Sequence, residues 1–246
     1  MIYQIPKAEI ELAVRTGFIT RSIWESEFAK DLKPSWRYEK WNKLEKRGFF
    51  KPHSSEYAKG VLVPVADHPK VKELVGDFVA PPPSVAVLGH DEKVVRTFLK
   101  LKREGVLSFA KFEAELKKED LRNKKHFDPS DSTKFPDLLI GLQGPNSGKR
   151  IALEFELSRK EPKRYRQMMI SYVCHREISA IIFVTDLDVI KNGIRAAIRD
   201  TYFPEWDKPV GFASLKEILE NPMKATIKLP ERETSLQTIQ TGKNFG

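Results

Sequence analysis

Residues 134–160, KFPDLLIGLQGPNSGKRIALEFELSRK, contain three carboxylates within two apolar runs. Asp137 opens the first run, and Glu154 and Glu156 lie two residues apart in the second. Side chains alternate along a strand, so Glu154 and Glu156 are expected on one face. The intervening segment is rich in Gly, Pro, Asn and Ser, which predicts a hairpin that brings Asp137 towards Glu154. Such a cluster of oxygen ligands can hold a hard divalent cation.

A solvated face of an antiparallel sheet is the alternative interpretation of the same two acids. The residues that follow favour the metal site. Residues 159–173 are predicted to form a basic helix that starts at Glu161-Pro162 and includes Lys163 and Arg164. Positive charge is therefore expected close to the acidic strand.

The charge balance points to a polyanionic partner. Lys and Arg number 43 and Asp and Glu 34, so the chain of 246 residues has a formal net charge of +9. Double-stranded DNA is the leading candidate, and a membrane surface is the second. No apolar stretch is long enough to span a bilayer, and the N-terminus lacks the apolar core of a signal peptide, which predicts a soluble cytoplasmic protein without a membrane partner. The single cysteine excludes an internal disulfide.

A proline run, Pro81-Pro82-Pro83, is predicted to separate two domains. Before it, apolar spacing predicts helices over 7–17, 20–31 and 35–47. Phe49-Phe50 and the segment GVLVPV then predict a two-stranded hairpin. Three short helices followed by a hairpin are typical of a winged helix-turn-helix, which we expect over residues 1–80.

The third of these helices carries an excess of positive charge. In a winged helix it would lie in the DNA major groove while the hairpin touches the backbone. The predicted DNA-binding residues of this region are Arg37, Lys40, Lys43, Lys46, Arg47 and Lys51. A solvated helix face is the alternative, and winged helices also serve as protein-binding modules. Whether DNA binding needs a homodimer is left open.

After the prolines, the pattern predicts an α/β domain over residues 84–229. A helix is expected from Asp91 to Glu104, with Asp91 as a cap at its start and Glu92 as a candidate metal ligand. The run SAIIFVTD, residues 179–186, is typical of a central buried strand reached by a helical crossover. Helices are expected over 187–200 and 213–220. Residues 230–246 are polar and are predicted to form a flexible tail.

The ordered set KLEKRGFF, LGHDEKVV, FPDLLI, IALEFELSR, KRYRQMMISYV and AIIFVTD resembles the replication-relaxation family of plasmids and integrative elements. The resemblance covers most of the chain. It implies a winged helix joined to a degenerate PD-(D/E)xK nuclease-like domain with a restriction-endonuclease-like α/β fold. It also implies an accessory DNA-binding role in mobilisation or replication, with a relaxase or other mobilisation proteins as partners.

Matched to the nuclease pattern, Asp137 is the aspartate of the first motif and Glu154 the acid of the second. Glu156 falls where active members carry a lysine that stabilises charge on the phosphate, so the resemblance leaves catalysis in question. Lys160, or Arg159, on the following helix would supply the missing positive charge. In an active enzyme, Mg²⁺ would be held by Asp137, Glu154 and the Phe155 carbonyl, with Glu92 as a further ligand.

Three functions follow from this pattern. The first is a DNA-binding accessory protein whose nuclease-like domain is a scaffold. The second is a Mg²⁺-dependent DNA endonuclease that uses Asp137 and Glu154. The third is a transcriptional regulator of the element, which the N-terminal domain alone would support.

Overall fold

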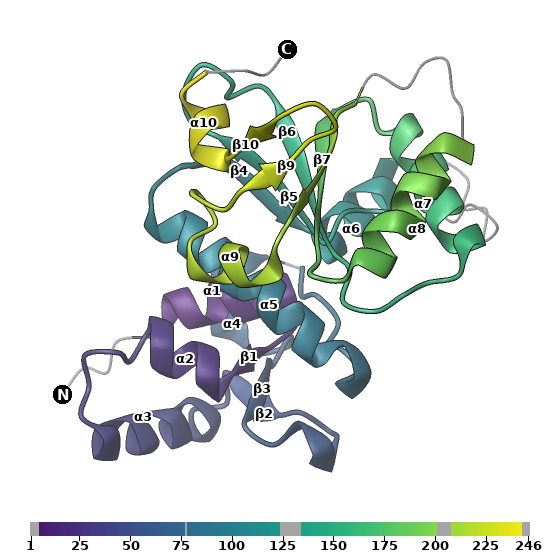
Figure 1. The fold of residues 1–246 in the computed structure, drawn as a ribbon. Helices are drawn as coiled ribbons and strands as arrows, with labels where there is room; N and C mark the ends of the chain where they lie inside the picture. Colours follow the sequence, from purple (N-terminus) through teal and green to yellow (C-terminus); the bar gives the residue numbers. More distant parts are fainter. Residues whose placement is uncertain (1–4, 77, 124–133, 201–207, 243–246) are drawn as a thin grey trace. The chain divides into compact units, whose positions relative to one another are not determined.

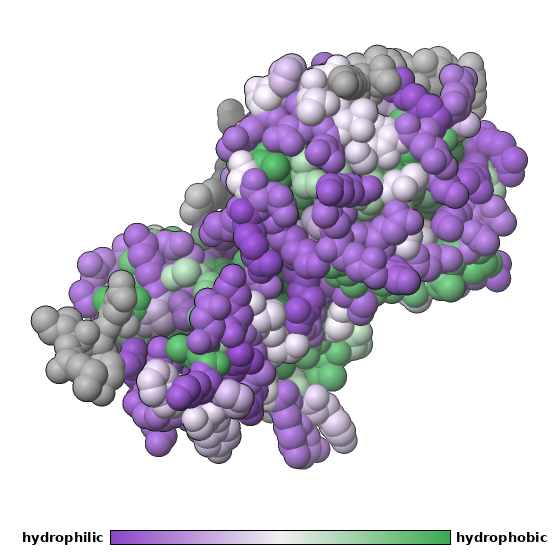
Figure 2. Space-filling view, turned by 60° about the vertical axis from the view of Figure 1, so that its left-hand side comes forward, coloured by the Kyte–Doolittle hydropathy of each residue, from purple (hydrophilic) through white to green (hydrophobic). Residues whose placement is uncertain are grey.

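The computed structural model describes residues 5–76, 78–123, 134–200 and 208–242 (Figure 1). The chain is of the mixed α/β class and divides into two compact units, Met1–Val95 and Arg96–Gly246. Among the described residues, no helix combines the length and apolarity that crossing a membrane requires. The surface visible in Figure 2 is largely hydrophilic, with hydrophobic side chains in small separate areas.

The N-terminal unit combines helices with a small antiparallel sheet whose strand order is β1-β3-β2. Its elements are α1 (Lys7–Thr16), β1 (Ile19–Thr20), α2 (Arg21–Glu27), α3 (Pro34–Lys46), β2 (Phe50–Pro52), the 3-10 helix η1 (Glu56–Ala58), β3 (Val61–Pro64) and α4 (Pro69–Val75). The predicted three helices and hairpin are therefore present. The short strand β1 and the helix α4 were not predicted.

Local sequence explains the helix boundaries of this unit. Gly17 ends α1 with a φ of 84°, and a Cβ atom there would lie 2.1 Å from the carbonyl oxygen of Pro81. Only glycine fits such a position. Thr20 caps α2 by accepting a hydrogen bond from the backbone N–H of Ile23, at 3.1 Å. Pro34 occupies the first turn of α3, where its missing N–H costs nothing.

Helix α5 (Val85–Arg103) crosses the division between the units, which falls after Val95. The predicted boundary at Pro81–Pro83 and the predicted helix start at Asp91 are thus both displaced. The proline run only precedes the helix, and the first half of α5 belongs to the N-terminal unit, where Thr20 Oγ1 donates to Glu92 at 3.3 Å. Asp91 consequently lies inside a helix and is not its cap.

The second unit is built on a seven-stranded sheet of order β10-β9-β8-β7-β6-β5-β4. Its elements are β4 (Leu107–Phe112), α6 (Glu113–Asn123), β5 (Leu138–Leu142), β6 (Arg150–Phe155), α7 (Pro162–Cys174), β7 (Ile178–Val184), α8 (Asp188–Asp200), β8 (Val210–Ala213), α9 (Leu215–Glu220), β9 (Ile227–Lys228), β10 (Glu233–Thr234) and α10 (Leu236–Gln240). Strands β6, β7 and β8 are parallel, and the other pairs are antiparallel. The prediction of β7 as a buried strand reached by a helical crossover is confirmed.

Helices α7 and α8 cover one face of this sheet (Figure 1). Tyr165 and Tyr172 of α7 and Ile194 of α8 are fully buried against Ala152 of β6 and Phe183 of β7. Apolar side chains of both helices exclude water from this layer. The layer packs against the face of β6 that carries Glu154.

The prediction of a flexible polar tail from residue 230 is wrong for the described residues up to 242. Strand β10 pairs with β9, and α10 buries Leu236 and Ile239. Asn146 also donates a hydrogen bond to the Ile239 carbonyl at 2.8 Å. The segment escapes sequence reasoning because only two apolar residues, three apart, anchor a five-residue helix. Residues 243–246 lie outside the described range.

Candidate functional site

Asp137 and Glu154 come together as the hairpin predicts. Leu138 pairs with Leu153 in the β5–β6 ladder, which sets Asp137 opposite Glu154, and the Phe155 backbone N–H donates to Asp137 Oδ2 at 2.8 Å. Glu154 is 1% exposed and Asp137 9% exposed. The alternative of a solvated sheet face is therefore wrong, because β6 is an inner strand covered by α7.

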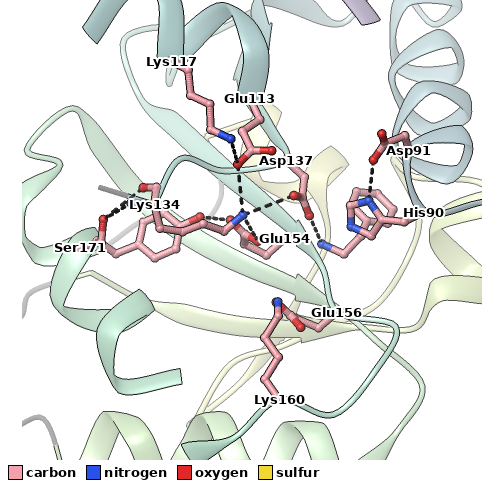
Figure 3. Close-up of polar contacts among 12 residues, drawn as sticks. His90, Asp91, Glu113, Lys117, Lys134, Asp137, Glu154, Glu156, Lys160 and Ser171 are labelled. Atoms are coloured by element: carbon pink, nitrogen blue, oxygen red, sulfur yellow. Dashed lines mark hydrogen bonds and ion pairs between the residues drawn. The ribbon is translucent and has the colours of Figure 1, made fainter. Parts of the chain in front are cut away.

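A lysine that sequence reasoning missed lies between these carboxylates (Figure 3). The Nζ atom of Lys134 is 3.3 Å from Glu154 Oε2, 3.4 Å from Asp137 Oδ1 and 3.9 Å from Glu113 Oε1. Its side chain is 26% exposed. The only sequence signal for it is its position three residues before Asp137. We call Lys134, Glu113, Asp137 and Glu154 the Lys134 cluster.

The backbone of Lys134 is fixed to helix α7. Its N–H donates to Ser171 Oγ at 2.7 Å, and the Ser171 hydroxyl donates back to its carbonyl oxygen at 3.1 Å. His175 Nε2 lies 3.0 Å from the same carbonyl oxygen, and the Phe135 ring packs on the His175 ring with centroids 5.3 Å apart. These contacts hold the start of the segment leading into β5, so the lysine side chain is directed at the acids.

Burial sets the protonation of this cluster. Burial, followed by the charge of Asp137, raises the pKa of Glu154 to about 8, against the opposing influence of Lys134 and of the Tyr172 hydroxyl, which donates to Glu154 Oε1. Burial also raises the pKa of Tyr172, so its hydroxyl stays protonated. Burial alone would lower the pKa of Lys134, but attraction by Glu154, Asp137 and Glu113 outweighs it and raises that pKa. The lysine therefore stays a cation, and the pKa of Glu154 lies well above its ordinary value.

Glu156 and Lys160, the other two predicted catalytic residues, form a separate pair. Glu156 follows β6 directly, is 2% exposed and is bound by the Lys160 ammonium. The Lys160 backbone N–H donates to the Tyr165 hydroxyl at 3.0 Å. Lys160 thus neutralises Glu156, so Glu154 on β6 and Glu156 just after it have different lysine partners.

Glu92, the third predicted metal ligand, belongs to the N-terminal unit, where it accepts a hydrogen bond from Thr20 Oγ1. His90 Nδ1, two residues before Glu92, lies 2.9 Å from Asp91 Oδ1. Within the described ranges, no group of three or more His, Cys, Asp or Glu side chains is arranged to hold a metal ion. An ammonium group, Lys134 Nζ, sits among the carboxylates predicted to bind Mg²⁺. The residues as arranged do not fit that ion.

The predicted DNA-binding residues of the N-terminal unit lie on an exposed surface. In α3 only Trp41 and Leu44 are buried, whereas Trp36 is 56% and Tyr38 58% exposed. The residues of the predicted set that are solvent-exposed here are Lys40, Lys46 and Lys51, and those that are partly buried are Arg37, Lys43 and Arg47. Tyr57, in the loop between β2 and β3, is 81% exposed.

Arg37 and Lys43 of that set bind neighbouring groups of the same unit. Arg37 donates from Nε to the Leu32 carbonyl at 2.9 Å and from its terminal nitrogen to the Lys30 carbonyl at 2.7 Å, which fixes the turn before α3. Lys43 pairs with Glu39 one turn away. In the second unit, Lys163 and Arg164 lie in the first turn of α7, within the predicted basic helix, and both are exposed.

Comparisons with protein-family models, with curated proteins and with solved structures find no match to this chain.

Proposed function

We propose that this chain is a double-stranded DNA-binding protein whose N-terminal unit is a winged helix-turn-helix. The observation that carries the proposal is the surface of α3 and of the β2–β3 hairpin. This surface exposes Lys40, Lys46 and Lys51 together with Trp36 and Tyr57. Lysines supply phosphate contacts, and exposed aromatic side chains add contact area that a merely solvated helix would not keep.

The order of elements supports the same proposal. Strand β1 precedes α2 and α3, and β2 and β3 follow as a hairpin on the same small sheet. Burial of Trp41 and Leu44 fixes one side of α3 to the unit, so the opposite side is presented outward. A helix presented in this way can enter the major groove, and the hairpin loop can reach the adjacent backbone.

For the second unit we propose a nuclease-like domain that has become a scaffold. The convergence of Asp137 and Glu154 on neighbouring strands favours a nuclease-like arrangement. Lys134 and Lys160 pair with the acids of this region and leave no open carboxylate set for a metal among the described residues. Lys163 and Arg164 add exposed positive charge on α7, and we assign them a secondary role in DNA contact.

An accessory role in plasmid or mobile-element mobilisation, with a relaxase as partner, is the biological setting we propose. Its support is the sequence resemblance. The convergence of Asp137 and Glu154 favours one competing function, a Mg²⁺-dependent endonuclease, and that function requires Lys134 to leave the carboxylates.

The test of DNA binding is a fluorescence-anisotropy titration of duplex DNA in a salt series, with native chain, Lys40→Glu and Lys72→Glu. Lys72 is exposed in the same unit but on α4, so it is a matched charge reversal. We expect salt-sensitive binding that Lys40→Glu weakens about 10-fold, with a loss of about 1 in the salt slope, while Lys72→Glu stays near native. Equal weakening by both variants would show that only net charge matters, and would refute the proposal that the α3 surface binds DNA.

A further inference from the structure

Three carboxylates from three different elements converge on one cation in the second unit. Glu113 begins α6, Asp137 precedes β5 and Glu154 lies on β6, and the Lys134 ammonium is within 3.9 Å of all three (Figure 3). Acids brought together from separate elements repel each other unless a cation lies among them. In this chain the cation is a side chain.

Hydrogen bonds fix the Lys134 backbone at both its N–H and its carbonyl oxygen. Ser171 exchanges two hydrogen bonds with Lys134, and His175 contacts the same carbonyl oxygen. Ser171 is itself 8% exposed. The backbone that carries the ammonium is therefore already in place opposite the acids.

We infer that Lys134 is the resident cation of this carboxylate site and takes the place that a divalent metal ion would have. A Mg²⁺ or Mn²⁺ ion entering the native site would have to expel Lys134 from its buried partners or be held beside a like charge. The native chain therefore binds no divalent cation there. Replacement of Lys134 by a neutral side chain leaves its acids without a counterion and opens the site to one. This inference concerns the second unit and stands whether or not the chain binds DNA.

The experiment titrates Mn²⁺ into native chain, Lys134→Gln and Lys117→Gln, with calorimetry and thermal unfolding as readouts. Lys117 is the matched control because it also pairs with Glu113, at 2.9 Å, but its side chain is 54% exposed. We expect no saturable Mn²⁺ binding by the native chain or by Lys117→Gln. Lys134→Gln should unfold about 5 °C lower, bind one Mn²⁺ with a Kd of up to about 1 mM and recover part of its Tm in Mn²⁺.

Two results would overturn the inference. The first is one saturable Mn²⁺ on the native chain that Asp137→Asn abolishes, since the metal and Lys134 would then coexist. The second is a Lys134→Gln variant as stable as Lys117→Gln and equally indifferent to Mn²⁺. If Lys134→Gln fails to fold, the Mn²⁺ titrations of the native chain and of Asp137→Asn decide alone. Absence of saturable Mn²⁺ binding by the native chain then supports the inference.

Discussion

The two units of this chain use charge in opposite ways. In the N-terminal unit, Lys40, Lys46 and Lys51 stand in solvent on α3 and the following strand. In the second unit, Lys134 meets Asp137 and Glu154 behind helix α7, where little water reaches. An exposed charge contributes little to stability and remains available to a phosphate, whereas a buried charge must be paired within the fold. Substitutions in the first unit should therefore change binding, and substitutions in the second should change stability.

The largest difference is expected between two tryptophans of helix α3, one buried and one exposed. Trp41 is buried against Trp24, with ring centroids 5.6 Å apart, and Trp36 is 56% exposed. Trp41→Ala should cost about 3–5 kcal/mol of unfolding free energy, because it empties a core position. Trp36→Ala should stay within about 0.5 kcal/mol but weaken DNA binding. Urea denaturation and anisotropy check both, and a loss of stability in Trp36→Ala would place that ring in the core.

The next comparison concerns the Tyr172 hydroxyl, which donates a hydrogen bond to the buried Glu154. Tyr172→Phe removes the donor to Glu154 Oε1 and leaves a buried oxygen without that partner. We expect a loss of about 1–3 kcal/mol in unfolding free energy, with unchanged DNA affinity. Tyr38→Phe is the control, since Tyr38 is 58% exposed. Equal stability of the two variants in urea denaturation would contradict a buried polar cluster.

The third comparison concerns pH. Burial raises the pKa of Glu154 from 4.5 to about 8, so the folded chain binds this proton more tightly than the unfolded chain does. The contribution to stability is therefore full below about pH 4.5 and is lost as pH rises from about 4.5 to about 8. Glu154→Gln, which resembles the protonated acid, should unfold with a shallower decline over that window. Parallel stability curves for native chain and Glu154→Gln, measured by urea denaturation at several pH values, would show that Glu154 does not titrate there.

The sequence pattern predicted those parts of the fold that depend on contacts between residues close together in the sequence. The QGPNSGK segment predicted the β5–β6 hairpin, and this hairpin brings Asp137 to Glu154. The helices α1 and α3 followed from apolar spacing. In each case the signal lies within some twenty residues of sequence.

The features that were missed depend on contacts between distant segments. Lys134 reaches the acids because Ser171 and His175, which lie 37 and 41 residues later, hold its backbone. Nothing in the sequence KFPD shows that. The strands β9 and β10 are two residues long and exist only through pairing with the sheet, so their own sequence carries no periodicity.

The most direct test of the account is incubation of supercoiled plasmid with native chain and Asp137→Asn, in Mg²⁺, in Mn²⁺ and in chelator. Gel retardation and nicking are followed together. The account predicts that both proteins retard the DNA equally under all three conditions and that neither cuts it, because α3 binds and Lys134 occupies the acidic site. Nicking by the native chain that requires Mg²⁺ or Mn²⁺ and is lost in Asp137→Asn would contradict it and make the second unit a nuclease.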